Sequence, residues 1–573
     1  MNMDALELYK SGRGPIPKRM LKWFLYGKGI ESLKIAEVDV PEIGPDEILV
    51  RQDANGLCFS DTKVIALGNE HPRMQGRDLA TDPATLGHEV AVTVVKVGEK
   101  RRDMFAVGDR FIVQADVFYK GVSMAYGYAI SGGLAQYSVI PTPMIDGDEG
   151  CYLLPIRKDT GYAETALVEP WACVVGAYNQ SHRAGPKPGG RMLILAGENA
   201  RLAELGGILA PSVRPSTLAI VGPEASSVAR GTVALRKKEV EDWAVLRQTE
   251  TGGAGFDDIL VLGVLAPEVV EAAAALLANH GIVNFVGPHP YARRLTLDIG
   301  RIHYNWHHYI GTVAWDPMTA YHEPRGADLK AGGAAWFIGA GGPMGQMHVQ
   351  RAVMHRNPPA VVVGTDIDAA RLATLVDRYQ ETADRRGIQL IALNPKEMSS
   401  EEFDQRLREV SGGGFDDIVS LVPVPALIEH ATGFLKDGAW FNIFAGVARG
   451  TMASLDVNDI RARGVRYIGS SGSSIADMRQ TLAMVESGEL STNASLAAIG
   501  GMRAAAEGLA GVRDGRFPGK TLVFPLIEDL PLMALTDLKH AYPSVYAKLA
   551  DGKFWTREAE DELLRLTIAR EGE

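Results

Sequence analysis

The sequence predicts an α/β protein in which a β-rich domain precedes two doubly wound parallel-sheet domains and a closing segment. Short apolar runs broken by Gly, Pro and Asp fill the first part, and strands alternate with helix-length segments in the middle. A third observation is an internal repeat within that middle part. At about 150 residues per domain, the 573 residues leave room for three or four domains. We place the four segments at 1–185, 186–325, 330–500 and 501–573.

The first segment is expected to form a compact sheet or barrel. Its apolar runs are EILVRQ, VAVTVVKVG, DRFIVQA and AQYSVIP, and turn-forming residues separate them. From about residue 190 the spacing changes to that of strand–helix–strand units, which build parallel sheets.

The repeat consists of three short matches that occur in the same order in both α/β domains. The matches are Phe256–Ile259 with Phe415–Ile418 at an offset of 159, Leu297–Ile299 with Leu455–Val457 at 158, and Tyr309–Gly311 with Tyr467–Gly469 at 158. Since three matches keep nearly one offset, duplication of a whole unit explains them better than chance.

Composition excludes several classes of protein. The formal net charge of −11 gives no support for binding nucleic-acid phosphates. We find neither a signal-peptide pattern at the N-terminus nor an apolar run of about 18 residues. The three cysteines, Cys58, Cys151 and Cys173, form no CxxC pair, so a disulfide framework is not expected. A reducing cytoplasm fits this cysteine usage best.

One group of residues has the chemistry of a catalytic zinc site, which needs three protein ligands and one open position. Cys58, His88 and Glu169 supply a thiolate, an imidazole and a carboxylate. Glu89 could be the third or fourth ligand, or reach the metal through water. Asp61 is expected to orient His88, because a metal-bound imidazole usually donates its other N–H to an acceptor. Taken singly, each residue has an ordinary structural explanation, such as a buried cysteine or a helix-starting Glu–Pro.

The segments that contain these residues, Cys58–Asp61, His88–Glu89 and Glu169–Pro170, together resemble the medium-chain dehydrogenase/reductase family, in which they occur in the same order. The supporting segments are Val97–Gly98, Val107–Arg110 and Gly132–Tyr137, and in the second α/β domain Phe415–Ile418, Ala439–Gly446, Tyr467–Gly472 and Asp477–Arg479. Glu169–Pro170 points to the polyol (sorbitol-like) branch. Two departures are Val92, where the family usually has Gly, and the missing four-cysteine zinc lobe.

The resemblance implies a GroES-like catalytic domain over residues 1–185, to which the segment 501–573 returns. It also implies bound zinc, NAD as cofactor, and a sugar or polyol alcohol as substrate, with a sugar phosphate as one possibility. Cys58, His88, Glu89 and Ser60 are then the expected catalytic residues, with Ser60 passing the hydroxyl proton toward solvent.

The second α/β domain contains a glycine-rich turn between an apolar strand and a predicted helix. Gly339, Gly341, Gly342 and Gly345 would let the backbone approach a pyrophosphate at the helix N-terminus, although Ala340 replaces one expected glycine. Asp366 follows the next strand and would accept the ribose hydroxyls, which favours NAD over NADP. We see no Arg in that immediate segment to receive a 2′-phosphate.

The first α/β domain has lost this turn. At an offset of 143, Asn199 stands where the second domain has Gly342, and Leu202 stands where it has Gly345. Glu224 corresponds to Asp366 at an offset of 142. We interpret this domain as a degenerate copy that no longer binds dinucleotide.

The degenerate copy retains a possible structural task. Both copies keep an edge-like Tyr-Ile-Gly segment, and pairing these two edges would satisfy their backbone groups. We therefore predict an intramolecular pseudo-dimer with one NAD site, in the second copy. His303, His307 and His308 precede the first edge, and we expect them to form a packing surface rather than a metal site.

Two other functions remain open from sequence. Zinc and tightly held NAD could serve a redox-neutral lyase or epimerase through transient oxidation of a sugar. A non-catalytic scaffold or sensor is the third possibility, and the intact Cys58, His88 and Glu169 argue against it.

Overall fold

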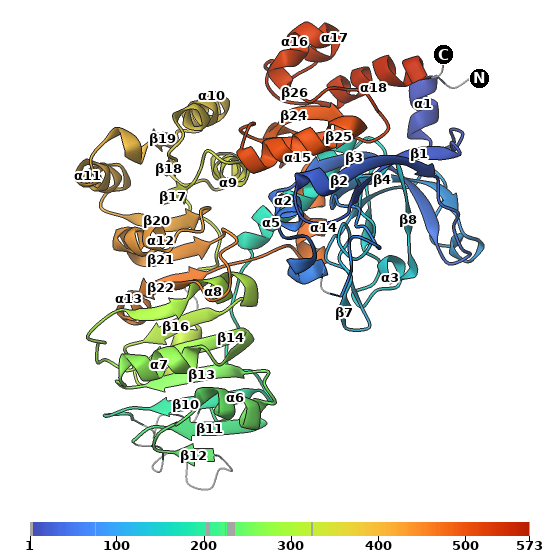
Figure 1. Ribbon diagram of the computed structural model, residues 1–573. Helices are drawn as coiled ribbons and strands as arrows, with labels where there is room; N and C mark the ends of the chain where they lie inside the picture. The colour runs from blue at the N-terminus through green and yellow to red at the C-terminus, as the bar shows by residue number, and fades with distance from the viewer. Residues whose placement is uncertain are drawn as a thin grey trace. The chain divides into compact units, whose positions relative to one another are not determined.

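The computed structural model describes residues 4–74, 76–201, 205, 207–223, 225, 235–322 and 325–571. The chain divides into two compact units, each of which is continuous in space but not in sequence (Figure 1). Unit 1 comprises residues 1–175, 342–347 and 472–573, and unit 2 comprises residues 176–341 and 348–471.

Unit 1 contains the β-rich part of the chain. Its N-terminal elements are α1 (Ala5–Lys10), β1 (Arg19–Leu25), β2 (Leu33–Asp39), β3 (Ile48–Leu57), α2 (Phe59–Leu67), η3 (Pro72–Met74), β4 (Glu89–Val97), β5 (Arg110–Val113), β6 (Phe118–Tyr119), β7 (Val122–Ser123), β8 (Tyr137–Ile140), α3 (Thr142–Ile145), β9 (Leu153–Pro155), α4 (Tyr162–Ala166) and α5 (Val168–Ala177). Its C-terminal elements are α14 (Ile475–Glu486), β24 (Leu496–Gly501), α15 (Ala505–Asp514), β25 (Lys520–Phe524), β26 (Met533–Ala534), α16 (Leu538–Ala541), α17 (Pro543–Tyr546) and α18 (Arg557–Glu571).

The central sheet of unit 1 joins the two ends of the chain. Its strand order is β26-β24-β25-β3-β4-β5-β9, with β8 also paired to β3. Helices α1 and α18, from opposite ends of the chain, lie side by side, and Lys10 of α1 forms a 2.5 Å ion pair with Asp561 of α18 (Figure 1). Strand β3 is buried along its whole length because it lies in the middle of this sheet.

The C-terminal boundary of the parallel-sheet region differs from the one placed at residue 500. The segment from Gly472 onward groups with unit 1, and β24 pairs with β25 rather than with a strand of the preceding sheet. A helix followed by a strand continues the strand–helix alternation, so the sequence pattern could not tell which sheet β24 joins.

Unit 2 contains two successive α/β halves. The first half has β10 (Arg191–Ala196), β11 (Thr217–Val221), β12 (Leu235–Lys237), α6 (Trp243–Thr251), β13 (Phe256–Leu262), α7 (Pro267–Ala274), β14 (Leu277–Val286), β15 (Leu295–Asp298), α8 (Ile299–Asn305) and β16 (His308–Thr312). The second has β17 (Ala334–Ile338), α9 (Pro343–Met354), β18 (Val361–Thr365), α10 (Ala369–Arg385), β19 (Gln389–Leu393), α11 (Ser400–Ser411), β20 (Phe415–Ser420), α12 (Pro425–Ala431), β21 (Leu435–Ile443), β22 (Met452–Leu455), α13 (Val457–Arg463) and β23 (Arg466–Ile468). The first residues of α9, up to Met347, group with unit 1.

One twelve-stranded sheet runs through both halves. The order is β12-β11-β10-β13-β14-β16-β23-β21-β20-β17-β18-β19, and the strands follow one another along unit 2 in Figure 1. Neighbouring strands are parallel within each half, as the strand–helix alternation predicts. The halves meet where β16 and β23 pair antiparallel, with Tyr309 opposite Tyr467. A separate two-stranded ladder joins β15 to β22.

The repeated Phe-Asp-Asp-Ile segment stabilises the start of the first strand in each half. In the first half, Asp257 accepts a hydrogen bond from Lys187 Nζ at 2.8 Å and from the Arg191 N–H at 2.9 Å. In the second half, Asp416 accepts from Lys330 Nζ at 2.5 Å and from the Ala334 N–H at 3.0 Å. The same contacts therefore fasten the first strand of both halves, although most of the surrounding sequence differs.

The halves differ after their first strands. Helix α9 follows β17, whereas the described residues between β10 and β11 form turns. Asn199 adopts a positive φ of 65° in this loop. Leu202 and Glu224, two of the positions compared above, lie outside the described residues.

The histidine-rich segment packs where the two halves meet. His303, His307 and His308 are buried, and the His303 ring lies 3.1 Å from the Ile443 carbonyl of the second half. Burial lowers the pKa of His308 to about 3, with nearby cationic groups adding to the effect. Within the described ranges, these histidines are not part of a group whose ligand atoms lie close enough to hold a metal ion.

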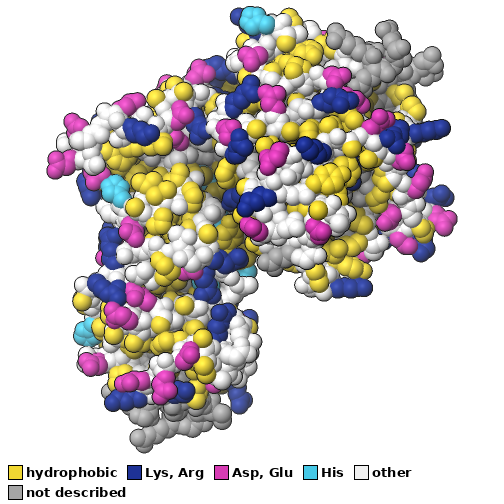
Figure 2. All heavy atoms as spheres, in the orientation of Figure 1, with side chains coloured by type: hydrophobic (Ala, Val, Ile, Leu, Met, Phe, Trp, Pro, Cys, Tyr) yellow, Lys and Arg dark blue, Asp and Glu magenta, His cyan; other side chains and the backbone are white. Residues whose placement is uncertain are grey.

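Surface charge is mixed rather than gathered by sign. Figure 2 shows basic and acidic side chains interspersed over the face in view, in keeping with the weak net charge. None of the helices in the described ranges combines the length and apolar character needed to span a membrane.

Candidate functional site

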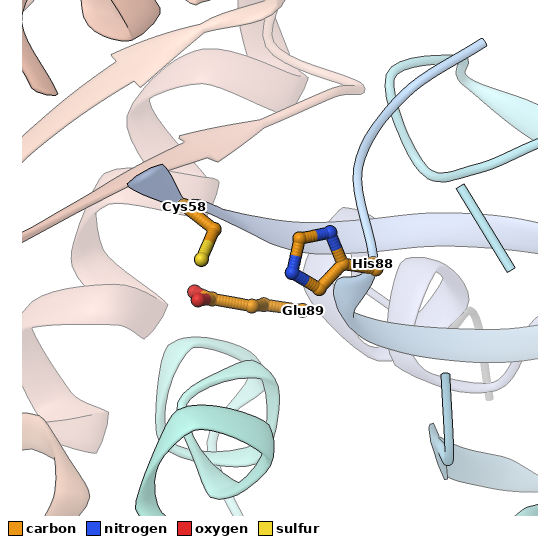
Figure 3. Close-up of side chains that lie close together, drawn as sticks. All are labelled: Cys58, His88 and Glu89. Atoms are coloured by element: carbon orange, nitrogen blue, oxygen red, sulfur yellow. The ribbon is translucent and has the colours of Figure 1, made fainter. Parts of the chain in front are cut away.

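Three of the predicted metal ligands lie together in unit 1. Cys58 directly follows β3, His88 precedes β4, and Glu89 is the first residue of β4. Strands β3 and β4 pair antiparallel with Gly56 opposite Glu89, so the sheet itself brings the two segments together. The nearest ligand atoms of Cys58, His88 and Glu89 all lie within 4.8 Å of one another (Figure 3).

His88 is held from both sides of its ring. Ser60 Oγ lies 3.2 Å from Nε2, and Asp61 Oδ1 lies 3.3 Å from Nδ1. Burial of the ring opposes its protonation, but the Asp61 carboxylate together with Tyr128 and Cys58 raises the pKa of His88 well above its ordinary value. Asp61 also accepts the Cys58 N–H at 3.1 Å, so one carboxylate positions both the thiol and the imidazole.

Glu89 is fixed by a buried ion pair that the sequence analysis missed. Its Oε1 accepts a hydrogen bond from Lys520 Nζ at 2.6 Å, and both side chains are buried. Burial disfavours the Lys520 ammonium, but the charges of Glu89 and Cys58 raise its pKa above the ordinary value. Strand β25 carries Lys520 to the site, because it pairs antiparallel with β3 at Thr521 and Leu57.

The second oxygen of Glu89 remains unsatisfied. Oε2 is buried and has no hydrogen-bond partner among the described residues. A Cβ added at Gly56 would clash with this oxygen and would lie 3.0 Å from Glu89 Cβ, so a side chain at position 56 would displace the carboxylate. A buried carboxylate oxygen without a partner is costly, and a cation would relieve that cost.

Glu169 lies near the three residues but outside the group whose ligand atoms are mutually close. It stands in the first turn of α5 and is buried. Burial raises the pKa of Glu169 to about 7; Glu89 adds to the increase, whereas His88 opposes it. Cys173 is one helical turn farther along α5, and burial together with the negative charge of Glu169 raises the pKa of its thiol.

The donor set fits a zinc ion. Sulfur, imidazole nitrogen and carboxylate oxygen are the ligand types that zinc prefers, and Asp61 supplies the usual support for the other ring nitrogen of His88. The partnerless Glu89 Oε2 is independent structural support for a cation here.

The Tyr128 ring borders this group of residues and was also not foreseen. Its centroid lies 5.8 Å from that of His88 and 5.9 Å from that of His71. Tyr128 stands far from both histidines in the sequence, in a stretch without a chemical motif, so no sequence signal pointed to it.

The predicted nucleotide-binding turn in unit 2 follows β17. Gly339 has a φ of 84°, a conformation that favours glycine, and its N–H donates to the Thr365 carbonyl at 2.8 Å. The Gly341 N–H donates to Asp366 Oδ2 at 2.9 Å. The turn and the acidic residue after β18 are therefore adjacent. Gly342 and Gly345 follow in the chain, immediately before α9 and in its first turn.

Asp366 has an arginine nearby that the sequence analysis did not consider. A Cβ added at Gly341 would lie 2.7 Å from Arg371 Cβ and 2.8 Å from Asp366 Oδ2. The Arg371 guanidinium lies 3.6 Å from Asp368. The sequence analysis found no arginine in the segment immediately after Asp366, but the first turn of α10 brings Arg371 back toward the glycine-rich turn.

Comparisons with known proteins agree with this fold. A model of the alcohol dehydrogenase GroES-like domain matches residues 44–145. Mannitol-1-phosphate 5-dehydrogenase of Aliivibrio fischeri is 30% identical over 311 residues, covering 50% of this chain and 72% of that protein. L-sorbose 1-phosphate reductase of Klebsiella pneumoniae is 31% identical over 313 residues, covering 50% and 74%.

A solved structure extends the likeness of fold over most of the chain. The 2R,3R-butanediol dehydrogenase from Bacillus subtilis aligns with a TM-score of 0.50 and 14% identity, covering 88% of this chain and 99% of that one. These findings confirm the GroES-like domain and an α/β part of Rossmann type. The chain belongs to the medium-chain alcohol and polyol dehydrogenase family.

Proposed function

We propose that this chain is a zinc-dependent oxidoreductase that transfers a hydride between a secondary alcohol of a sugar or polyol and NAD. The observation that carries the proposal is the group of Cys58, His88 and Glu89, with its partnerless carboxylate oxygen. The names of the relatives, a mannitol-1-phosphate dehydrogenase and a sorbose-1-phosphate reductase, support a sugar or polyol substrate.

Cys58 and His88 would hold the zinc ion together with a carboxylate from Glu89, Glu169 or both. When bound, zinc acts as a Lewis acid that lowers the pKa of an alcohol hydroxyl. Glu89 is already close to the other two donors, whereas Glu169 offers a buried carboxyl that titrates near neutrality.

The chain's own residues position the reacting groups. Asp61 fixes the ring of His88 and the backbone of Cys58. Lys520 forms a buried ion pair with Glu89, which balances the charge of this carboxylate and holds it in place. Ser60 is half-buried and adjacent to His88, so its hydroxyl can accept the proton of the substrate hydroxyl and pass it toward solvent.

The nucleotide is proposed to bind the second half of unit 2. Gly339, Gly341, Gly342 and Gly345 line the turn that would receive the pyrophosphate, and Asp366 would accept the ribose hydroxyls. NAD is proposed over NADP because Asp366 would repel a 2′-phosphate. The neighbouring Arg371 weakens that preference, although Asp368 shares its charge.

We infer that the two halves of unit 2 are copies of one domain that pair as subunits of a dimer would. In the β15–β22 ladder Thr296 lies opposite Ser454, its own counterpart in the repeat. A residue that meets its own counterpart is the mark of a two-fold interface. Glu271 accepts the Thr296 N–H at 2.8 Å, and Glu429 accepts the Ser454 N–H at 2.6 Å, so the flanking contacts repeat as well.

One nucleotide per chain follows from this arrangement. The first half lacks a described helix after its first strand, and Asn199 stands where the second half has Gly342. The remaining task of the first half would then be to cover the edge of the second. The segment 472–573 would complete the catalytic domain, and the cytoplasm remains the expected compartment, since Cys58, Cys151 and Cys173 are free.

The experiment is a metal and nucleotide analysis of the purified chain, followed by a screen of polyols and their phosphates for NADH formation. About one zinc and one nucleotide per chain, with NADH formed from at least one compound, is the expected result. Substrate isomerised or dehydrated without net NADH would instead favour the redox-neutral alternative, which the relatives' names do not support.

A further inference from the structure

A group of basic side chains borders the proposed zinc site on the side of Ser60. We call Lys63, His71 and Arg73 the basic cluster; they stand in α2, just before η3, and in η3. The Arg73 guanidinium lies 4.8 Å from the centre of the Tyr128 ring, and the His71 ring stacks on the same ring at 5.9 Å. Tyr128 in turn contacts His88, so a single aromatic ring separates the cluster from a proposed ligand.

Arg73 is the exposed member of the cluster, whereas Lys63 and His71 are half-buried, and all three side chains can donate hydrogen bonds. The Arg73 side chain is 42% exposed, and its Nη2 forms a 2.7 Å ion pair with Asp116. That carboxylate fixes one end of the planar guanidinium, and the guanidinium has further N–H donors. Lys63 follows Ser60 by one helical turn and its ammonium lies 5.8 Å from the Phe59 ring.

His71 adds a neutral donor beside these two cations. Its Nδ1 accepts the Arg73 N–H at 3.2 Å, which leaves the ring proton on Nε2. Burial, and after it the charges of Arg73 and Lys63, lower the pKa of His71, so the ring is neutral near pH 7. The cluster therefore carries two positive charges, one of them shared with Asp116, and an imidazole N–H.

We propose that the basic cluster binds the phosphate group of a polyol phosphate monoester whose hydroxyl is oxidised at the zinc site. The inference rests on the proposed function, since it assigns a substrate class to that site. A phosphate monoester carries nearly two negative charges near pH 7 and accepts several hydrogen bonds. An arginine fork with a lysine and an imidazole N–H matches that charge and that number of acceptors.

A free polyol would give this cluster nothing to neutralise. Hydroxyl groups carry no charge, so a free polyol gains no charge-assisted hydrogen bond from Arg73 or Lys63. Asp116 alone would repel a phosphate, but here its ion pair with Arg73 balances its charge. The cluster therefore discriminates between a polyol and its phosphate rather than between two polyols.

The test uses the zinc-loaded full chain with mannitol, sorbitol and galactitol, each as the free polyol and as its terminal phosphate monoester. The ester is expected to have at least about a tenfold higher kcat/KM than the free polyol, because charge-assisted hydrogen bonds hold it. Arg73→Gln should lower the ratio of the two kcat/KM values by about tenfold, mainly through KM of the ester. Arg73→Lys should restore part of it.

A matched control and a binding measurement complete the test. Arg19 is 51% exposed and pairs with Asp39 at 3.0 Å, so Arg19→Gln removes a similar surface pair and should leave the ratio unchanged. NAD titrated into Arg73→Gln should bind as in the parent chain; weaker NAD binding would mean that the cluster serves the cofactor's phosphates, and would overturn the proposal.

The outcomes separate this inference from the proposed function. If free polyols are oxidised but the esters are no better, or if Arg73→Gln leaves the ratio unchanged, the phosphate site is refuted while the oxidoreductase stands. If neither class is oxidised, the proposed function fails, and calorimetric titration with inorganic phosphate decides the inference. Millimolar binding that Arg73→Gln abolishes supports the site, whereas absent or unaltered binding refutes it.

Discussion

Tyr309 and Tyr467 lie opposite each other where β16 and β23 join the two halves of unit 2. They are the first residues of the two Tyr-Ile-Gly segments and so occupy equivalent places in the repeat. Both side chains are buried, and one continuous hydrophobic core contains them with residues from both halves. An exposed strand edge invites pairing with another chain, and here each half covers the other's edge.

Gly469, which ends the second Tyr-Ile-Gly segment, should be intolerant of substitution. A Cβ at Gly469 would lie 2.8 Å from His303 Cα in the other half, a backbone atom that cannot turn aside. We expect Gly469→Val to lower the free energy of unfolding by about 1–3 kcal/mol through overpacking, with a lower thermal midpoint. Gly433→Val, whose added Cβ meets nothing within 4 Å, is the control. Equal midpoints for the two variants would contradict close packing of the halves here.

The metal ligands should be distinguishable by zinc content. Cys58→Ser and Glu89→Gln should both lower zinc occupancy, because they remove donors that lie within 4.8 Å of each other and of His88. Glu169→Gln tests whether the second buried carboxyl also binds. Cys151→Ser, a free cysteine outside the group, should keep about one zinc per chain. Elemental analysis of the purified variants gives the answer, and full occupancy in Cys58→Ser would rule out the assignment.

Removal of Lys520 should cost stability in a metal-dependent way. Lys520→Met leaves the buried Glu89 carboxylate without its partner. Breaking a buried ion pair in this way typically lowers the free energy of unfolding by about 3–5 kcal/mol. In the zinc-loaded chain the cation takes over part of that charge, so the loss should be smaller. Thermal unfolding with and without a chelator measures both values. The same loss in both states would show that Glu89 does not face the metal.

The nucleotide preference should depend on two side chains of opposite charge. Asp366→Ala should narrow the preference for NAD over NADP, because it removes the carboxylate that repels a 2′-phosphate. Arg371→Gln should widen the preference, since it removes a positive charge from a side chain whose Cβ lies beside the glycine-rich turn. Ratios of kcat/KM with the two nucleotides test both changes. Better turnover of the unaltered chain with NADP would overturn the role given to Asp366.

Glu560 should make the stability of the catalytic domain depend on pH. This carboxyl accepts the N–H groups of Tyr162 and Ala163 at 2.6 and 2.7 Å, and burial raises its pKa to about 7. A carboxyl whose pKa is higher in the folded state favours folding while protonated. That contribution is present below about pH 4, the pKa of an unfolded glutamate, and is lost as pH rises to about 7; it amounts to about 3 kcal/mol.

Calorimetric unfolding between those pH values tests this prediction. As pH rises, the thermal midpoint of the parent chain should fall relative to that of Glu560→Gln, because glutamine does not ionise. Glu558→Gln, an exposed neighbour on the same helix, should follow the parent chain. Parallel pH curves for all three proteins would contradict a raised pKa at Glu560.

The sequence predicted the parts of the site that local patterns determine. Cys58 and His88 were expected to lie together with Glu169, and Glu89 was expected as a third or fourth ligand. The antiparallel pairing of β3 with β4 brings Cys58, His88 and Glu89 together, whereas Glu169 lies outside that group. Lys520 was not foreseen, because its place depends on a strand from the far end of the chain pairing with β3. Strand registers of that kind depend on tertiary packing rather than on motifs.

The same limit applies to the nucleotide site and to the end of the sheet region. Arg371 reaches the glycine-rich turn through the path of α10, which a search of the strand end at Asp366 does not include. The segment after Gly472 continues a helix–strand alternation but joins the other sheet. In both cases the sequence pattern predicted the local element, but it did not show which other segment that element contacts in the fold.

The most direct test of the account is the formation of NADH by the full-length chain when polyols and their phosphates are offered with NAD, before and after zinc is removed. The account predicts NADH formed in step with oxidation of the alcohol, lost on chelation and restored by added zinc. It is contradicted if no compound yields NADH, or if turnover continues undiminished once the metal has been stripped.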